Sequence, residues 1–249
     1  MTHPPEGALA PFIRKLNRRV NLGADEIDAL RRLPYEIDEL DRGCYLVREG
    51  AAPGHCIALI SGFLYRSKVT GDGARQIISV HLQGDLVCAH DHLLGEADHS
   101  IQALTRVRVA YIPQEALLSA IEACPVLAHA LWRDNLVDAS VAREWMLNLG
   151  RRKARQRVAH FMCEMTVRSK AAGTCDGLRY AWPLTQEELG DATGLTPVHI
   201  NRTLQSLRRE QLVDVGRGKI HIVDWIGLQT AGDFTVSYLH EEGADYIMG

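Results

Sequence analysis

The most informative stretch of the chain, residues 184–213, reads LTQEELGDATGLTPVHINRTLQSLRREQLV. Its pattern predicts two short helices joined by a tight turn. Thr185 and Glu188 have the spacing of a capping box, in which each side chain accepts a hydrogen bond from the other residue's backbone N–H. Gly194 can adopt the positive φ that ends the first helix, and Thr196-Pro197 supplies an N-cap and a first-turn proline for the second. A turn of about three residues between helices is typical of a helix-turn-helix.

The segment that follows predicts a β-hairpin. Residues 212–215 and 220–223 both alternate apolar and polar side chains, and the sequence Gly-Arg-Gly-Lys at 216–219 joins them. Such a pair of short strands around a glycine-rich turn is the pattern of a hairpin. A helix-turn-helix followed by a basic hairpin predicts a winged helix, whose wing touches the phosphate backbone of DNA.

The second helix of the pair has two different faces. Ile200, Leu204 and Leu207 recur at helical spacing and are expected to face the core. On the opposite side we predict contacts with base edges in the major groove from Val198, His199, Asn201, Arg202 and Gln205. Phosphate contacts are predicted for Thr185, Gln186, Thr196, Arg208, Arg209, Arg217 and Lys219. A helical hairpin packed inside an unrelated globular domain is the alternative interpretation.

The distribution of charge supports a partner that is a polyanion. The whole chain carries 28 Lys plus Arg and 31 Asp plus Glu, a net charge of −3. Residues 151–219 hold 13 basic and 7 acidic side chains, a net charge of +6, so the rest of the chain carries −9. The basic side chains are densest at residues 151–157, where a solvated helix face is the alternative. A positive field confined to one segment indicates that this segment meets the DNA.

Length and composition exclude several classes of protein. With 249 residues, 46% of them hydrophobic and 24% charged, the chain is expected to form two domains of an ordinary globular protein. It has no apolar run near the roughly 20 residues that span a bilayer and no signal-peptide core, so we expect no membrane association and a cytoplasmic location. The six cysteines lack CxxC or zinc spacing and are expected to be reduced and mostly buried.

The sequence pattern of residues 35–112 is typical of an antiparallel β-structure. Apolar runs at 55–61, 63–69, 77–82 and 107–112 are separated by short segments that contain glycine. The clearest hairpin is expected at residues 69–76, where Gly-Asp-Gly allows a tight turn. Short strands at this spacing predict a barrel or jelly roll, and a helix is expected before it at residues 25–33.

Residues 125–149 contain no internal glycine or proline and predict one helix of about 25 residues, about 37 Å long. Its apolar positions are too numerous for a helix that buries only one narrow face. We expect one side to cover the β-domain and another to pack against a second copy of the chain, although Asp134 and Asp138 interrupt the heptad. The predicted dimer contacts are Leu127, Leu131, Val137, Val141 and Trp145. Packing of the whole helix against its own chain is the alternative.

The fold class expected from these segments is α+β. An N-terminal antiparallel β-roll (jelly roll) precedes a long dimerisation helix and a C-terminal winged helix-turn-helix. The expected limits are 1–20 for an N-terminal arm, 21–117 for the β-roll, 118–150 for the long helix, 151–231 for the winged helix and 232–249 for a tail.

Over residues 20–230 this order resembles the Crp/Fnr family of bacterial transcription regulators. The matching motifs are Gly62, Gly71-Asp72-Gly73 with Arg75-Gln76-Ile77, Gly84-Asp85, residues 184–190, Gly194-Leu195-Thr196 and Ile200-Asn201-Arg202. The resemblance implies a homodimer whose second helices enter successive major grooves of a palindromic site, about 34 Å apart. It also implies activation through RNA polymerase in many members and repression in some.

The chain departs from the family pattern in the recognition helix and in the sensor. Pro197-Val198 replaces the polar pair that follows the helix cap in well-known members, whereas Arg202 keeps the position that can pair with a guanine. The operator is therefore expected to differ from the family's best-known sites. Cyclic-nucleotide binders of the family hold the phosphate with an arginine, but residues 76–105 contain none, and Asp91, Glu96 and Asp98 would repel a phosphate.

The signal that the sensor detects is not identified by the sequence. Cyclic AMP is disfavoured, and the iron-sulfur branch of the family needs N-terminal cysteines, whereas the first here is Cys44. A metal or haem could use four histidines, His81, His90, His92 and His99, and a redox switch could use Cys88 or Cys124. Solvated histidines and inert thiols are the alternatives.

Two other functional classes stay open. An enzyme is not expected, because the chain lacks a nucleophile elbow, a Walker loop, a dinucleotide-binding turn and an H-E-x-x-H motif. A cyclic-nucleotide-binding-like interaction module is the second alternative, in which the winged helix would bind protein and not DNA.

Overall fold

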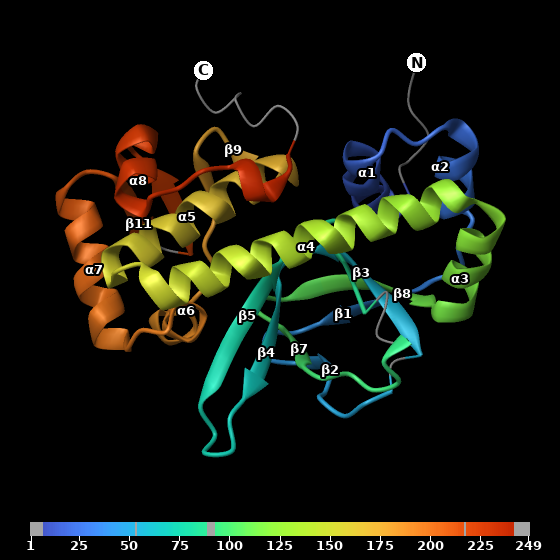
Figure 1. Ribbon diagram of the computed structural model, residues 1–249, viewed down its shortest axis with the longest axis horizontal. Coiled ribbons are helices and arrows are strands. Elements are labelled where there is room, and N and C mark those ends of the chain that lie inside the picture. The colour runs from blue at the N-terminus through green and yellow to red at the C-terminus, as the bar shows by residue number, and fades with distance from the viewer. Residues whose placement is uncertain (1–6, 53, 89–92, 217, 242–249) are drawn as a thin grey trace. The chain divides into compact units, whose positions relative to one another are not determined.

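The computed structural model describes residues 7–52, 54–88, 93–216 and 218–241, and Figure 1 shows its helices and strands. The chain divides into two compact units. The first comprises Met1–Lys68 and Val80–Leu136, and the second comprises Val69–Ser79 and Val137–Gly249. The boundary after Leu136 falls inside a helix that both units share.

The predicted antiparallel β-roll is present, and its strands lie in the first unit except for residues 69 and 75–79, which belong to the second. One sheet has the order β1-β8-β3-β6, formed by β1 (Glu36–Leu40), β8 (Val107–Pro113), β3 (His55–Ser61) and β6 (Leu86–Val87). The other has the order β2-β7-β4-β5, formed by β2 (Tyr45–Val47), β7 (Ser100–Ala103), β4 (Leu64–Val69) and β5 (Arg75–His81). The neighbours β1–β8, β3–β8, β3–β6, β2–β7 and β4–β7 are antiparallel, as predicted.

Alternating positions of β3 and β8 face two different apolar clusters, so the middle of this sheet is buried on both faces. Ile57 and Leu59 of β3 pack with Leu64 of β4, Ile101 of β7 and Val109 of β8 in one apolar cluster. Burial on this scale contributes roughly 1.5–3 kcal/mol for each large side chain. The predicted hairpin at residues 69–76 is present as the turn between β4 and β5. Its Thr70 N–H donates to the Ala74 carbonyl at 2.9 Å.

Two helices precede the roll, and the first corrects our expectation of an N-terminal arm. Helix α1 (Ala10–Arg19) buries Phe12, Ile13 and Leu16, which join Leu9 in a second apolar cluster. The spacing of these four residues is that of a helix with one buried face, so the sequence itself carries a signal for α1. Helix α2 (Ala24–Arg31) confirms the predicted helix and buries Leu30.

The acidic residue that interrupts the heptad of the long helix has a partner on α1. Asp134 is buried, and its carboxylate accepts from the Lys15 ammonium at 2.8 Å and forms an ion pair with the Arg19 guanidinium at 3.4 Å. Lys15 also forms an ion pair with Asp85 at 3.1 Å. A buried carboxylate is tolerated when it is paired in this way. Asp134 therefore holds the long helix against α1.

Helix α3 (Gln114–Ala123) leads into the long helix α4 (Pro125–Arg151), which confirms the helix predicted at residues 125–149. No single described helix is long and apolar enough to cross a membrane. Helices α3 and α4 pass that test only when taken together, and they are bent by 119° at the break between them.

The side of α4 that we assigned to a second copy is covered by the chain itself. The five predicted dimer contacts are all buried, with exposed fractions of 0, 4, 5, 9 and 6% for Leu127, Leu131, Val137, Val141 and Trp145. Leu127 and Leu131 belong to the cluster of α1. The helix has two apolar sides, as expected. The residues that we assigned to the dimer contact lie on the side that packs on its own chain, because sequence periodicity does not distinguish the two sides.

The second unit contains the winged helix-turn-helix. It consists of α5 (Ala154–Ala171), β9 (Cys175–Asp176), β10 (Arg179–Ala181), α6 (Gln186–Thr193), α7 (Pro197–Arg209), β11 (Val213–Gly216), β12 (Lys219–Ile222), α8 (Trp225–Gly232) and η2 (Ser237–Leu239). Its sheet has the order β11-β12-β10-β9. Helix α5 lies in the centre, and its side chains from Val158 to Val167 are buried.

The C-terminal tail predicted from residue 232 is part of this unit as far as residue 241. Phe234, Tyr238 and Leu239 are buried, and the Phe234 ring meets the rings of Trp225 and His160 edge-on. The second unit of the structure therefore continues beyond the expected limit at 231. All six cysteines are free, as expected, but Cys56, Cys88 and Cys163 alone among them are fully buried, and Cys44 is exposed.

Candidate nucleic-acid interface

The start and the end of α6 have the geometry that the sequence predicts. The Glu188 N–H donates to the Thr185 hydroxyl at 3.1 Å, and the Thr185 N–H donates to the Glu188 carboxylate at 2.8 Å. Both halves of the capping box are therefore present. Gly194 ends the helix at φ 64° in the left-handed region, where glycine carries no steric penalty.

A second glycine fixes the distance between α6 and the turn. A Cβ atom on Gly190 would lie 2.4 Å from the Leu195 carbonyl oxygen, a distance that real side chains do not reach. The backbone of the turn therefore packs directly on α6, and Ile200 of α7 lies beside the same position. This close approach sets the angle at which α7 leaves the turn.

Helix α7 presents the predicted residues on one exposed face. The Thr196 hydroxyl caps the helix by accepting from the His199 N–H at 3.4 Å, and Pro197 occupies the first turn. Ile200, Leu204 and Leu207 are buried as expected. The five predicted base contacts, Val198, His199, Asn201, Arg202 and Gln205, are all exposed, so the fold brings them together on the side away from the core.

The side chains of this face differ in how they are held. The Arg202 guanidinium forms no hydrogen bond or ion pair with any residue of the described ranges, so its fork of donors is available. Asn201 donates to the Gln186 side-chain carbonyl at 3.5 Å, and the His199 ring lies 3.2 Å from the Thr196 hydroxyl. The face thus combines one available guanidinium with two side chains oriented by the helix caps.

The predicted phosphate contacts surround this face. Thr185, Gln186, Thr196 and Lys219 are exposed, and helix N-termini such as those at Thr185 and Thr196 favour anions. The Arg208 guanidinium donates to the Val215 carbonyl of β11, and Arg209 donates to the Gln205 carbonyl at 3.3 Å. Arg208 therefore also braces the wing on α7. Arg217 lies outside the described residues.

The wing is present as predicted. Strand β11 pairs with β12 in antiparallel register, with Val213 opposite Ile222 and Gly216 opposite Lys219. Ile220 and Ile222 are buried, whereas Lys219 at the turn is exposed. The Trp182 N–H donates to the Gly218 carbonyl at 2.8 Å, which ties the turn of the wing to the segment after β10.

Comparison with known proteins supports the same assignment for both units. Residues 156–231 match the model of the Crp-like helix-turn-helix domain, and residues 37–124 match the model of the cyclic nucleotide-binding domain. The chain is 27% identical over 226 residues to the transcriptional activator protein Anr of Pseudomonas aeruginosa, a match that covers 91% of each chain. It is 29% identical over 167 residues to the nitrogen fixation regulation protein FixK of Bradyrhizobium diazoefficiens, covering 67% of this chain and 69% of that one.

Solved structures support the fold. The structure of FixK2 from Bradyrhizobium japonicum superposes with a TM-score of 0.72 at 23% identity and covers 82% of this chain and 100% of that one. A CRP family regulator of Thermus thermophilus superposes with a TM-score of 0.64 at 19% identity, covering 80% and 97%. The chain belongs to the Crp/Fnr family. It is a DNA-binding transcription regulator, and the interaction module that binds protein in place of DNA is the less supported class.

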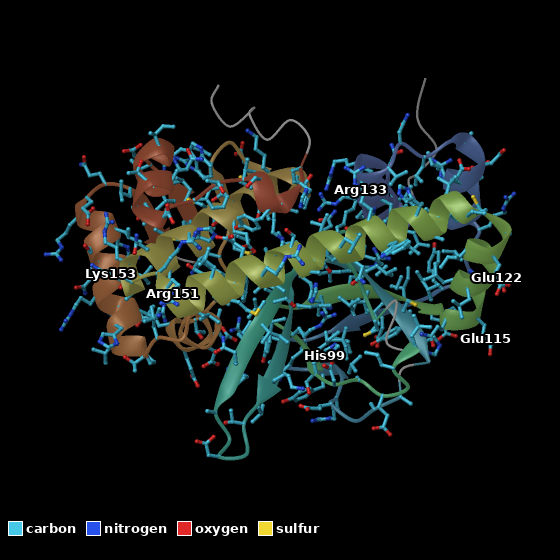
Figure 2. The ribbon with its side chains drawn as sticks, in the orientation of Figure 1. His99, Glu115, Glu122, Arg133, Arg151 and Lys153 are labelled. Carbon is cyan, nitrogen blue, oxygen red and sulfur yellow. The ribbon has the colours of Figure 1, made fainter. Side chains whose placement is uncertain are left out.

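The basic run at the start of α5 contributes less to the surface of this Crp/Fnr regulator than its sequence suggests. Arg151 and Lys153, labelled in Figure 2, are exposed. Arg152 is buried and forms an ion pair with Glu144 at 2.7 Å. Arg155 pairs with Glu210, and Arg157 donates to the Thr193 carbonyl at 3.1 Å. Three of the five cations therefore hold the fold, which the sequence alone did not reveal.

A group of polar side chains inside the second unit escaped sequence reasoning. We call Glu144, Trp145, Arg152, His160, Glu164 and Tyr238 the buried polar cluster. The Glu164 carboxylate is fully buried and accepts from the Trp145 indole and the Tyr238 hydroxyl, each at 3.0 Å. Burial raises the pKa of Glu164. Trp145, predicted at a dimer contact, thus joins α4 to α5 within one chain.

His160 is the titratable group at the centre of the buried polar cluster. Its ring nitrogens lie 3.2 Å from the Gly232 carbonyl and 3.0 Å from the Tyr238 hydroxyl. Burial, with a smaller contribution from the Arg152 charge, lowers the pKa of His160 to about 4. The imidazole is therefore neutral at physiological pH. No sequence pattern marked it, because its partners are 72 and 78 residues away.

Two histidines of the sensor region each lie beside a carboxylate that is close in sequence. The Asp85 carboxylate lies 3.5 Å from the His81 ring and the Asp98 carboxylate 2.7 Å from the His99 ring, which is labelled in Figure 2. His90 and His92 lie outside the described residues. Within the described ranges, no group of three His, Cys, Asp or Glu side chains could hold a metal ion. The described part of residues 76–105 contains no arginine.

Proposed function

We propose that the chain acts as a homodimer that binds a palindromic operator, with α7 of each protomer in one of two successive major grooves. The exposed face of α7 is the observation that carries this proposal. An α-helix fits the major groove, where each base pair shows a distinct pattern of donors and acceptors. Two helices related by a two-fold axis would lie about 34 Å apart, one turn of the duplex.

Base reading by this face would differ from that of the best-known members of the family. Arg202, whose guanidinium is available, would pair with guanine O6 and N7. His199 and Asn201 would read the neighbouring bases, because the position of the usual polar pair holds Pro197-Val198. Val198 is 71% exposed and offers a contact to a thymine methyl group. Phosphate contacts from the helix caps and from Lys219 would fix the register.

The exposed side of α4 supports the dimer. Trp132, Leu136, Met146 and Leu147, which we call the exposed α4 stripe, have exposed fractions of 65, 55, 65 and 47%. Positions 129, 132, 136, 139, 143 and 146 are separated alternately by three and four residues, the spacing of a coiled-coil seam. A large apolar stripe on the surface of a regulator marks an interaction site. A second α4 in the same register would cover it.

The β-roll would modulate the affinity for DNA in response to a signal. Relatives are named transcriptional activators, which favours activation through contact with RNA polymerase. Such a regulator works in the compartment that contains the chromosome, so we propose a cytoplasmic location.

The proposal is tested by selecting binding sites from a pool of random duplexes with the purified full-length chain. We expect an enriched inverted repeat, with half-sites about one helical turn apart. Binding should also weaken by orders of magnitude between about 50 and 200 mM salt, because phosphate contacts release counterions. A pool without any enriched sequence after repeated rounds would overturn the proposal and favour a protein-binding winged helix.

A further inference from the structure

The first unit contains a cavity that the DNA-binding function does not use. Its volume is about 400 Å³, and it is bounded by β2, the segment after β2, and strands β3 and β8. Ligand sites of small molecules have volumes of roughly 300–1,000 Å³. Nothing among its lining residues comes from the stretch 84–100, where the family holds its cyclic nucleotide. The cavity is therefore a different site.

Aromatic rings and a cation dominate the wall of the cavity. The Arg48 guanidinium lies 3.9 Å over the centre of the Tyr45 ring, and the His55 ring meets the Tyr111 ring edge-on at 6.1 Å. Val47 and Ile57 are buried and contribute apolar atoms to the lining of the cavity. A guanidinium stacked on a ring keeps its N–H groups in a plane, from which they can bind a carboxylate with two parallel hydrogen bonds.

Four side chains with polar groups line the cavity. Neither the Arg48 guanidinium, the His55 ring nor the hydroxyls of Tyr45 and Tyr111 form a hydrogen bond or an ion pair with any residue that the structure describes. Sites built for small molecules combine apolar walls with a few convergent polar groups. These four groups are available to a ligand.

The charges around the cavity restrict the ligand. Burial, together with the Asp38 charge, raises the pKa of Tyr111, so its hydroxyl stays protonated and can donate. Asp38 disfavours a second negative charge beside Tyr111, whereas Arg48 favours one beside Tyr45. One cation and one nearby carboxylate fit a monoanion better than a phosphate dianion.

We propose that this cavity binds a small planar carboxylate, with its carboxylate on Arg48 and its ring against the side chains of Tyr45, His55 and Tyr111. The ligand would be the signal that the β-roll detects. This regulatory part rests on the proposed function, since it requires that the chain bind an operator. Ligand binding itself does not require DNA.

Calorimetric titration of the full-length chain with benzoate and 2-naphthoate tests the binding. Benzamide and 2-naphthamide are controls that keep the ring and lose the charge. We expect the carboxylates to bind about tenfold or more tightly than the amides, the loss typical of a charged hydrogen bond. Saturation at concentrations up to about 10 mM is expected for at least one carboxylate.

Two arginine variants locate the site. Arg48→Gln should weaken carboxylate binding about tenfold or more, to the level of the amides. Arg108→Gln is the matched control, because Arg108 is exposed on β8, the strand of Tyr111, but does not line the cavity. Tyr111→Phe should weaken binding less than Arg48→Gln does. Absence of carboxylate binding up to about 10 mM, equal binding of acid and amide, or equal effects of the two arginine variants would each overturn the proposal.

The regulatory part has a separate readout. Affinity for the selected operator is measured with and without the tightest-binding carboxylate, for the wild type and for Arg48→Gln. A change in operator affinity that Arg48→Gln abolishes supports the role as a signal, and an unchanged affinity refutes it. If no operator can be selected, the proposed function fails, whereas the calorimetric result still decides whether the cavity binds a carboxylate.

Discussion

Arg202 and Lys219 are both exposed cations of the second unit, yet we expect them to contact different parts of the DNA. Arg202 lies on the face of α7 that would enter the groove, and Lys219 lies at the turn of the wing. Contacts with base edges determine which DNA sequence a protein prefers. Contacts with phosphates add affinity for any duplex without sequence preference. The two residues can therefore be separated by experiment.

Arg202→Ala is expected to cost about 1–3 kcal/mol of binding to the selected operator and to relax the preference at one base pair, because a bidentate pair with guanine is lost. Lys219→Ala is expected to weaken binding to all duplexes about equally. Affinities for the operator and for its single-base variants check both. A uniform loss with Arg202→Ala would show that Arg202 does not read a base.

His160 gives the second unit a predicted sensitivity to acid. Its pKa is about 4 in the folded chain and about 6.5 in an unfolded chain. Because the unfolded chain binds the proton first, the contribution to stability is complete above pH 6.5 and is lost as the pH falls toward 4. The loss reaches about 2 kcal/mol at pH 5.

The variant His160→Gln should therefore show a smaller decrease in the free energy of unfolding between pH 7 and pH 5 than the wild type, as measured by urea titration. The raised pKa of Glu164 acts in the opposite direction, since a folded state that holds the proton loses stability as the pH rises. Glu164 is unchanged in the variant, so the difference between the two proteins reports on His160. Identical slopes would contradict the low pKa.

Residues were predictable where their partners are close in sequence. Thr185 and Glu188 are three residues apart, and their capping box follows from local spacing. Lys15 and Asp134 are 119 residues apart, and Trp145 and Glu164 are 19 apart on different helices. No local pattern reveals such pairs, because the whole fold is needed to bring them together. The buried polar cluster was missed for this reason.

Helix α4 shows the same limit at the scale of a secondary-structure element. Its length and position follow from the absence of internal proline and from its apolar content, but its two apolar sides have similar periodicity. Burial distinguishes them, because one side packs on its own chain and the other carries the exposed α4 stripe. Helix α1 was predictable from the spacing of Leu9, Phe12, Ile13 and Leu16, which is that of a helix with one buried face.

Leu136→Glu is expected to convert the dimer to monomers, because it places a charge in the middle of the exposed α4 stripe, where an unpaired buried charge costs several kcal/mol. Asp138→Lys is the matched control, since Asp138 is exposed on the same helix and, two residues from Leu136, does not share a face with it. Sedimentation equilibrium checks both. A Leu136→Glu dimer as tight as that of Asp138→Lys would exclude the stripe as the interface.

Gly194→Ala is expected to lower the free energy of unfolding by about 1 kcal/mol or more. Its φ is +64°, and a Cβ there would lie 3.3 Å from the Leu149 side chain and 3.4 Å from the Arg157 guanidinium. Gly216→Ala serves as the control, because a Cβ at Gly216 meets nothing within 4 Å. Denaturant titration of both variants checks the difference, and equal stabilities would contradict the role of Gly194 in the turn.

At the scale of the whole molecule, the order of a β-roll, a long helix and a winged helix was predictable, because each segment has its own hydrophobic period. The boundary between the units was not, since it lies inside α4, where the sequence shows no break. The C-terminal segment around Tyr238 was also assigned outside the fold, although its aromatic side chains complete the core of the second unit.

The central claim is that two copies of α7 read two half-sites on one face of a duplex. Insertion of about five base pairs between the half-sites of the selected operator turns one half-site to the opposite face. Substitutions in the spacer that keep its length are the control. The account predicts that the insertion weakens binding about a hundredfold or more, toward non-specific affinity, while the control substitutions do not. An insertion that leaves the affinity of the full-length chain unchanged would contradict it.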